Sequence, residues 1–218
     1  MLLPRRALPL LAAALLALAA GGSSGAEARG AKAAPGKTAW GQATMAEVIS
    51  ESRPPVGWTE FCARHARECD TQAERPVPLA LDAKSWRLLL TVNGRVNRAI
   101  EPVSDADHWG VAERWDYPDD GRGDCEDFVL LKRAMLMEAG VPRSALLVTV
   151  VRDDRNDGHA VLTVVTTEGD FVLDNKRDAI LPWQRTGYRF YKRQSQEHPN
   201  RWVSIGGGNA TVTASSRP

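Results

Sequence analysis

The stretch Ala145–Asn175, "ALLVTVVRDDRNDGHAVLTVVTTEGDFVLDN", predicts the centre of the fold. It contains three runs rich in Val, Leu, Thr and Phe, and Gly, Asp and Asn gather between them. Apolar and β-branched runs separated by turn residues are typical of strands joined by hairpins. The stretch therefore predicts an antiparallel meander, which two later runs extend. The five predicted strands are residues 145–153, 159–167, 170–175, 188–193 and 201–205.

Upstream of the meander, apolar residues recur at helical spacing. This predicts a helix over about 83–100, with Asp82 as its N-cap. A second helix is predicted from about Asp124 to Ala139, and Gly140 fits its C-terminal cap. Residues 101–123 between them read as a long polar and aromatic loop. Because helices come first and strands follow, the sequence predicts an α+β domain rather than a βαβ alternation.

The N-terminal residues resemble a secretory signal. Two arginines precede an apolar run, Ala7–Ala20, and small residues follow it. An uncleaved membrane anchor is the alternative, but the run is shorter than the roughly 20 residues that a membrane-spanning helix needs. The sequence therefore predicts an exported chain with no stable membrane insertion after signal cleavage. The predicted parts are a signal peptide at 1–28, a flexible lead-in at 29–50, one domain at 51–205 and a disordered tail at 206–218.

The charge balance excludes one class of partner. The 218-residue chain carries 28 Lys and Arg against 27 Asp and Glu. Removing residues 1–28 takes away two Arg and one Glu, which leaves 26 of each sign. A neutral mature chain has no basic field to attract nucleic acid, so no nucleic-acid partner is expected.

Three cysteines in an exported chain suggest one pair and one free thiol. Cys62 and Cys69 are close in sequence, but on one straight helix they would lie roughly 10 Å apart along the axis. A disulfide therefore requires a turn near residues 65–67. A metal site formed by these cysteines with His65 and Asp70 is the alternative, and an oxidising compartment favours the disulfide.

The third cysteine, Cys125, falls at the first turn of the second predicted helix, where helix N-termini lower a thiol pKa. His159 opens a predicted strand, and Asp174 lies 15 residues later on the next strand. A nucleophile, a base and a residue that orients the base are the parts of covalent acyl transfer. Asp174 faces His159 if the hairpin centres between Thr166 and Thr167. It pairs with Thr163 if the loop centres two residues later, and the sequence leaves this open.

Several quoted motifs carry a resemblance to a known family. "GDCEDFVLLKRAMLMEAG", "GHAVLTV" and "DFVLDNKRDAILPWQRTGYRFYKRQS" occur in this order. The chain resembles the bacterial transglutaminase-like cysteine peptidases over about residues 55–195. The resemblance implies a papain-like fold, a Cys-bearing helix packed on an antiparallel sheet. It also implies Cys125 as nucleophile, His159 as base and Asp174 as the residue that orients it. Glu113 stands where the family pattern has Asp, and His65-Ala66 where it has a helix-breaking Pro.

The acids around Cys125 raise a difficulty, because nearby negative charge disfavours a thiolate. The resemblance implies that Asp124 and Glu126, with Asp127 a further candidate, bind Ca²⁺. Hard carboxylate oxygens suit that ion, and its charge would offset theirs. The alternative is that acids simply favour the first turn of a helix.

The sequence thus predicts a periplasmic cysteine endopeptidase that is activated by calcium. By the resemblance, the protein substrate is a large surface adhesin and the regulator is an inner-membrane receptor. Two alternatives remain open. One is an amidase or amide transferase with the same three residues, and the other is a non-catalytic periplasmic binding module.

Overall fold

The computed structural model describes residues 40–69, 72–73 and 75–206. The predicted signal peptide, residues 29–39 of the lead-in, Asp70 and the tail after Gly206 lie outside the described residues. Within the described part, no helix is long and apolar enough to cross a membrane.

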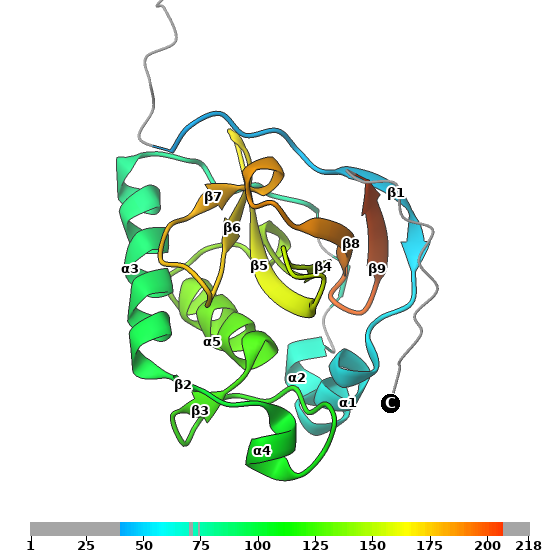
Figure 1. Cartoon of the computed structure of the whole chain (residues 1–218). Helices are drawn as coiled ribbons and strands as arrows, with labels where there is room; N and C mark the ends of the chain where they lie inside the picture. The colour runs from blue at the N-terminus through cyan, green and yellow to red at the C-terminus, as the bar shows by residue number, and fades with distance from the viewer. Residues whose placement is uncertain (1–39, 70–71, 74, 207–218) are drawn as a thin grey trace, which may run out of the picture. The chain divides into compact units, whose positions relative to one another are not determined.

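A seven-stranded sheet forms the centre of the described part, with the strand order β1-β9-β8-β4-β5-β6-β7 (Figure 1). Every pairing in this sheet is antiparallel. The five predicted strands correspond to β4, β5, β6, β8 and β9. The strand bounds are Glu47–Ser52 (β1), Leu146–Arg152 (β4), Gly158–Thr166 (β5), Gly169–Leu173 (β6), Leu181–Pro182 (β7), Arg189–Gln194 (β8) and Trp202–Gly206 (β9).

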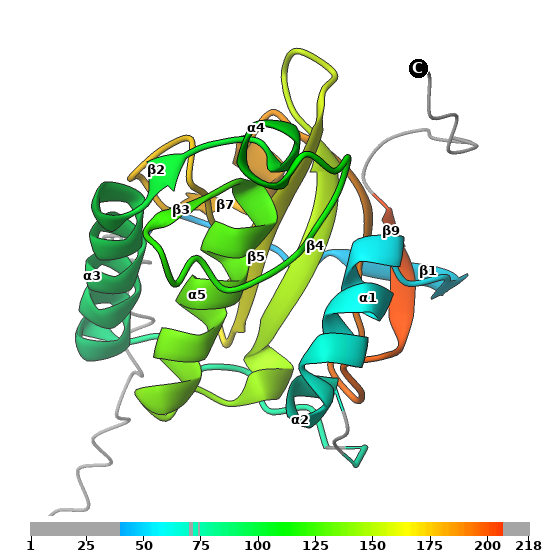
Figure 2. The same ribbon diagram turned by 90° about the horizontal axis from the view of Figure 1, so that it is seen from below.

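Helices pack on one face of this sheet. Figure 2 shows α5 lying across β4 and β5, with α3 beside it. Both long helices match their predicted ranges within one residue. The helix bounds are Val56–Arg64 (α1), Ala66–Cys69 (α2), Ala83–Ala99 (α3), Asp105–Trp109 (α4) and Cys125–Glu138 (α5), and short 3₁₀ turns cover Arg143–Ala145 and Trp183–Arg185.

Local capping explains where the two long helices begin and end. The Asp82 carboxylate accepts the N–H groups of Lys84 and Ser85, so it caps α3 as predicted. At the end of α5, Gly140 adopts a left-handed conformation with φ 88°. The Val141 N–H then donates to the Leu136 carbonyl and closes the helix. The Gly140 cap therefore fixes where the helix that carries Cys125 ends.

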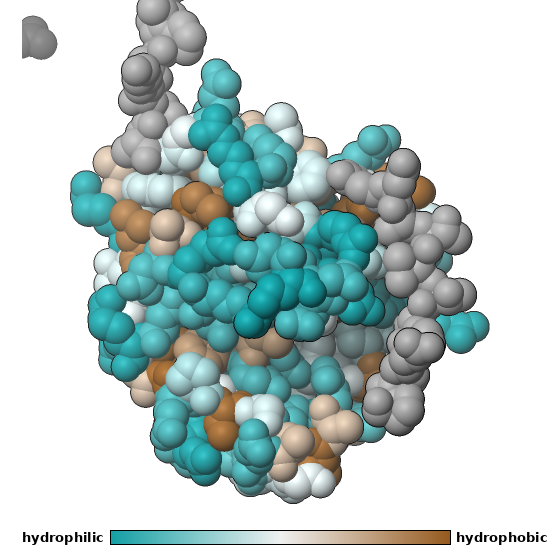
Figure 3. Space-filling view, in the orientation of Figure 1, coloured by the Kyte–Doolittle hydropathy of each residue, from teal (hydrophilic) through white to brown (hydrophobic). Residues whose placement is uncertain are grey.

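The main hydrophobic core lies between the helices and the sheet. It joins α1, α3 and α5 to the inner face of β4, β5 and β6, and its fully buried aromatic members are Trp58, Phe61, Phe128, Phe171 and Trp202. A smaller cluster covers the opposite face, with Val151, Val161, Val172, Tyr188, Phe190 and Ile205. In the orientation of Figure 1 the described surface is largely hydrophilic, with scattered hydrophobic residues (Figure 3).

Two predictions about irregular segments were wrong. Strand β1 begins at Glu47, inside the predicted flexible lead-in, because pairing with β9 orders it. The predicted loop 101–123 contains α4 and a short parallel pair, β2 (Glu101–Pro102) with β3 (Arg122–Gly123). Ser104 caps α4 by accepting the Asp107 N–H. The β2–β3 pair, by contrast, depends on pairing between segments about 20 residues apart, which residue patterns do not encode.

Candidate active site

The free cysteine lies at the first turn of α5, against the start of β5. Its sulfur accepts the Ala160 backbone N–H at 3.3 Å. The Cys125 thiol donates to Glu126 Oε2 at 2.9 Å. Burial and then the Glu126 carboxylate raise the pKa of the Cys125 thiol. With these groups alone, the sulfur therefore keeps its proton.

The structure brings His159 and Asp174 together. His159 Nε2 and Asp174 Oδ1 are 2.9 Å apart, and both side chains are 1% exposed. The Tyr188 hydroxyl donates to Asp174 Oδ2 at 2.6 Å. Burial alone would raise the pKa of Asp174, but the hydrogen bonds from His159 and Tyr188 outweigh it and lower that pKa. Asp174 is therefore a buried carboxylate that holds the imidazole by one nitrogen.

The other ring nitrogen, His159 Nδ1, is buried and has no hydrogen-bond partner among the described residues. Among the described residues, Cys125 and His159 are also not joined to each other by a hydrogen bond. Both side chains nevertheless line one cavity of about 440 Å³. Its other lining residues are Pro55, Glu113, Trp115, Asp124, Glu126, Val150, Gly158, Ala160 and Lys192.

The register that joins His159 to Asp174 is neither of the two predicted ones. In the β5–β6 hairpin Thr166 pairs with Gly169 and Leu162 with Leu173. Strand β6 therefore ends one residue before Asp174, which leaves the sheet just short of the position opposite His159. The imidazole bridges this diagonal offset, which long side chains on one face can span.

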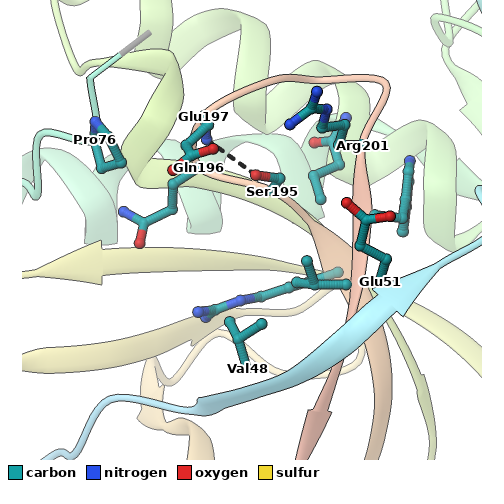
Figure 4. Close-up of a pocket in the computed structure, with 11 residues that line it drawn as sticks. Val48, Glu51, Pro76, Ser195, Gln196, Glu197 and Arg201 are labelled. Carbon is teal, nitrogen blue, oxygen red and sulfur yellow. Dashed lines mark hydrogen bonds between the residues drawn. The ribbon is translucent and has the colours of Figure 1, made fainter. Parts of the chain in front are cut away.

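A second cavity, of about 260 Å³, lies where β1 meets β8, β9 and the loop after β8 (Figure 4). Val48, Glu51, Ser195 and Arg201 are among its lining residues. None of the described residues that line it is a cysteine or histidine, so thiol chemistry is assigned to the cavity at Cys125.

Two asparagines on α3 hold the turn that follows Asp174. Asn97 Nδ2 donates to the Asp174 carbonyl and to Asp178 Oδ1, each at 2.9 Å. Asn93 Nδ2 donates to the Asp178 carbonyl at 3.1 Å. From the sequence, this pair of asparagines could form a solvated face or have a role near the site. The contacts show that the pair lies near the site, where it holds the turn after Asp174. Long-range hydrogen bonds of this kind have no signal in sequence spacing.

A group of carboxylates lies beside the cysteine. Ligand atoms of Asp105, Asp124 and Asp127 lie within 4.8 Å of one another, and so do those of Asp124, Cys125 and Glu126. The sequence analysis missed Asp105, which α4 carries into the group from 19 residues upstream of Asp124. Asp105 lies close enough to act as a ligand only because the loop 101–123 folds back toward the start of α5. Its distance in the sequence from Asp124 therefore does not indicate this role.

Burial and mutual repulsion disfavour the charged forms of these acids. Burial and then Asp105 raise the pKa of Asp124 to about 6. Burial, with a smaller contribution from Asp124, raises the pKa of Asp127 to about 8, although N–H donors oppose the shift. Burial and then Asp124 and Glu113 raise the pKa of Glu126. A cation among these oxygens would relieve the repulsion.

The donor set suits a hard divalent cation. Asp124 Oδ1 is buried and has no hydrogen-bond partner among the described residues, so one oxygen is free to serve as a ligand. An added Cβ at Gly123 would lie 2.6 Å from Asp127 Oδ2, so the backbone passes close to this carboxylate. Several carboxylate oxygens at one point are what Ca²⁺ takes in proteins. The residues present therefore fit the ion that the resemblance implies.

The two residues that depart from the family pattern make specific contacts. Glu113 Oε1 accepts the Trp115 indole N–H at 2.6 Å, so it takes part in the wall of the cavity. Helix α1 ends at Arg64, and His65 forms the turn before α2. Cys62 and Cys69 form a disulfide across this turn. The predicted turn is therefore confirmed, and proline is not needed to make it.

Comparisons with known proteins agree with the motif resemblance. The sequence profile of the family described as bacterial transglutaminase-like cysteine proteinase matches residues 48–210. Among curated proteins, none matches the chain.

Solved structures of LapG from Legionella pneumophila are similar to the chain. The calcium-bound form is 25% identical with a TM-score of 0.49, and the match covers 60% of this chain and 75% of LapG. The EGTA-treated form is 24% identical with a TM-score of 0.46, and the match covers 58% and 69%. Because the family profile spans most of the chain, this protein belongs to the bacterial transglutaminase-like cysteine proteinases and is a cysteine peptidase.

Proposed function

We propose that this peptidase is an exported, calcium-dependent endopeptidase that uses Cys125, His159 and Asp174. The observation that carries the proposal is the buried His159–Asp174 hydrogen bond in the same cavity as the only free cysteine of the described residues. A thiol, an imidazole and a carboxylate in this order are the parts of a cysteine-type acyl transfer.

In the acylation step, the Cys125 thiol gives its proton to His159 Nδ1, the nitrogen that Asp174 does not bind. The thiolate attacks the peptide carbonyl carbon, and the carbonyl π electrons move to oxygen. N–H groups of the first turn of α5, such as that of Cys125, lack an intrahelical acceptor and can stabilise this oxyanion. The imidazolium then protonates the amide nitrogen as the C–N bond breaks, which leaves a thioester on Cys125.

In the deacylation step, His159 takes a proton from water, which attacks the thioester carbonyl. The C–S bond breaks, the thiolate recovers the proton, and the new carboxyl terminus leaves. Asp174 stays ionised throughout and holds the ring by Nε2, while Tyr188 and the N–H of Lys176 hold Asp174.

The carboxylates of Asp105, Asp124, Glu126 and Asp127 would hold the calcium ion. When bound, the ion supplies positive charge that lowers the free-energy cost of a thiolate at Cys125. LapG has been solved with calcium, and for this chain the support comes from its own convergent carboxylates.

The cellular setting is inferred from the disulfide, the N-terminal sequence and the family resemblance. A disulfide between Cys62 and Cys69 suits an oxidising compartment, and with the signal-like N-terminus it favours the periplasm. A surface adhesin as substrate and an inner-membrane receptor as regulator follow from the family resemblance alone.

The test is a digest of a bacterial peptide library by the mature chain, with new termini identified by mass spectrometry. We expect new termini with calcium and none with Cys125→Ser or with excess chelator. Adding a primary amine separates hydrolysis from amide transfer, because a transferase would attach the amine to the new carboxyl terminus. The endopeptidase proposal is wrong if wild type and Cys125→Ser yield the same termini.

A further inference from the structure

The cavity at Cys125 is polarised. Its α5 side carries the carboxylates of Asp124 and Glu126, and the neighbouring loop carries Glu113. Strand β8 contributes Lys192, the only lysine or arginine among the lining residues. Asp124 and Glu126 serve the proposed metal site and Glu113 accepts the Trp115 indole N–H, whereas Lys192 has no part in the chemistry described above.

A β-bulge puts Lys192 on the side of the sheet that faces the cavity. Between β4 and β8, Val150 pairs with Lys192 but Val151 pairs with Phe190, so Tyr191 is an extra residue on β8. Alternate residues of a regular strand share a face. Here Phe190 packs in the small cluster on the far face, while Lys192 and Val150 both line the cavity. Bulges commonly redirect a side chain beside an active site.

The Lys192 ammonium has no carboxylate partner among the described residues. Its one hydrogen bond goes to the backbone carbonyl of Arg53, at 3.0 Å. Partial burial lowers the pKa of Lys192. An ammonium with three donors and one neutral acceptor has donors left for a ligand.

We propose that Lys192 forms a subsite that selects an acidic side chain of the peptide substrate next to the cleaved bond. The inference rests on the proposed endopeptidase function and adds a substrate class to it. Pro55 and Val150 offer an apolar wall for the stem of a Glu or Asp side chain, and the Lys192 ammonium donates to its carboxylate. A half-buried ion pair discriminates more strongly than one on the open surface.

A pair of alkylating reagents tests this without a known substrate. Bromoacetyl-glutamate α-amide and bromoacetyl-glutamine α-amide differ only in side-chain charge, and both alkylate Cys125 as the bromide leaves. The measured quantity is the ratio of the two alkylation rates at Cys125, determined with calcium present. Cys62 and Cys69 are bonded to each other, so labelling reports on Cys125 alone.

We expect Lys192→Met to lower the glutamate-to-glutamine ratio about three- to tenfold, in line with the loss of one partly buried charge contact. Lys192→Glu should lower it further, and Lys192→Arg should retain most of it. Lys84→Met, which removes an exposed lysine of α3, is the matched control and should leave the ratio unchanged. Thermal denaturation checks that each variant is folded.

Equal ratios in wild type, Lys192→Met and Lys192→Glu would overturn the subsite. If Cys125 reacts no faster than a free model thiol, that result counts against the proposed endopeptidase function. The glutamate-to-glutamine ratios of the Lys192 variants still test the subsite separately. In the peptide-library digest, the same inference expects Asp or Glu to be enriched beside the cleaved bond with wild type. That enrichment should be absent with Lys192→Met.

Discussion

Lys132 on α5 provides a quantitative test of the packing around the active site. Its side chain is 0% exposed, and Nζ has no hydrogen-bond partner among the described residues. Burial lowers the pKa of Lys132 from 10.5 to about 7, although Asp174 and Asp178 partly oppose the shift. Lysine is almost never fully buried without a partner, so this residue should cost stability.

The sign and size of the cost follow from proton linkage. Between pH 7 and 10.5 the unfolded chain binds the Lys132 proton and the folded chain releases it, so stability increases with pH. A pKa of about 7 corresponds to a cost of about 4 kcal/mol at pH 7 and about 2 kcal/mol at pH 9. Lys132→Met keeps the length of the side chain and removes the charge. Its gain in stability should therefore be about 2 kcal/mol larger at pH 7 than at pH 9.

Urea denaturation of wild type and Lys132→Met at the two pH values measures this difference, with chelator present so that metal binding does not contribute. Other titrating groups, Asp127 among them, cancel in the comparison between wild type and variant. The exposed Lys84→Met variant should show no pH-dependent difference. A gain for Lys132→Met that is the same at both pH values, or larger at pH 9, would refute the assignment of an ammonium that is buried without a hydrogen-bond partner.

Three further predictions concern the site. Asp105→Asn should weaken calcium binding about tenfold or more in isothermal titration calorimetry, because it removes one carboxylate of the group, while Asp107→Asn on the same helix should not. Tyr188→Phe should lower kcat about tenfold with little change in KM, since it removes the 2.6 Å hydrogen bond that holds the proposed orienting aspartate. Gly123→Ala should lower the Tm by several degrees even in chelator, because the new methyl would meet the Asp127 carboxylate at 2.6 Å, and an unchanged Tm would contradict the close approach.

Much of the fold follows from local patterns. Capping residues and apolar spacing place the two long helices, because both act within a few residues of each helix end. Alternating β-branched runs and turn residues place β4, β5 and β6 for the same reason. The edge strand β1 escaped detection because Glu47–Ser52 forms a strand only by pairing with β9, about 150 residues away.

For the candidate site, too, local motifs could be predicted from the sequence and long-range geometry could not. Cys125, His159, Asp174 and the acids around the cysteine were accessible from the sequence because they lie in recognisable motifs. The relative positions of these side chains could not be predicted from the sequence, because the register of the β5–β6 hairpin depends on the conformation of a few turn residues. The observed register differs from both that the sequence offered, and His159 still reaches Asp174 across the diagonal.

By itself, the sequence determined the order of the two long helices and of the five predicted strands, the start of the Cys125 helix and the need for a turn between Cys62 and Cys69. Capping, periodicity and chain reach are local properties, so they can be read from neighbouring residues. Tertiary structure alone decided that Asp105 joins the carboxylates, that Asn97 holds the turn after Asp174 and that a bulge directs Lys192 into the cavity. Each of these depends on segments far apart in the chain being packed together, and that packing is set by the whole core.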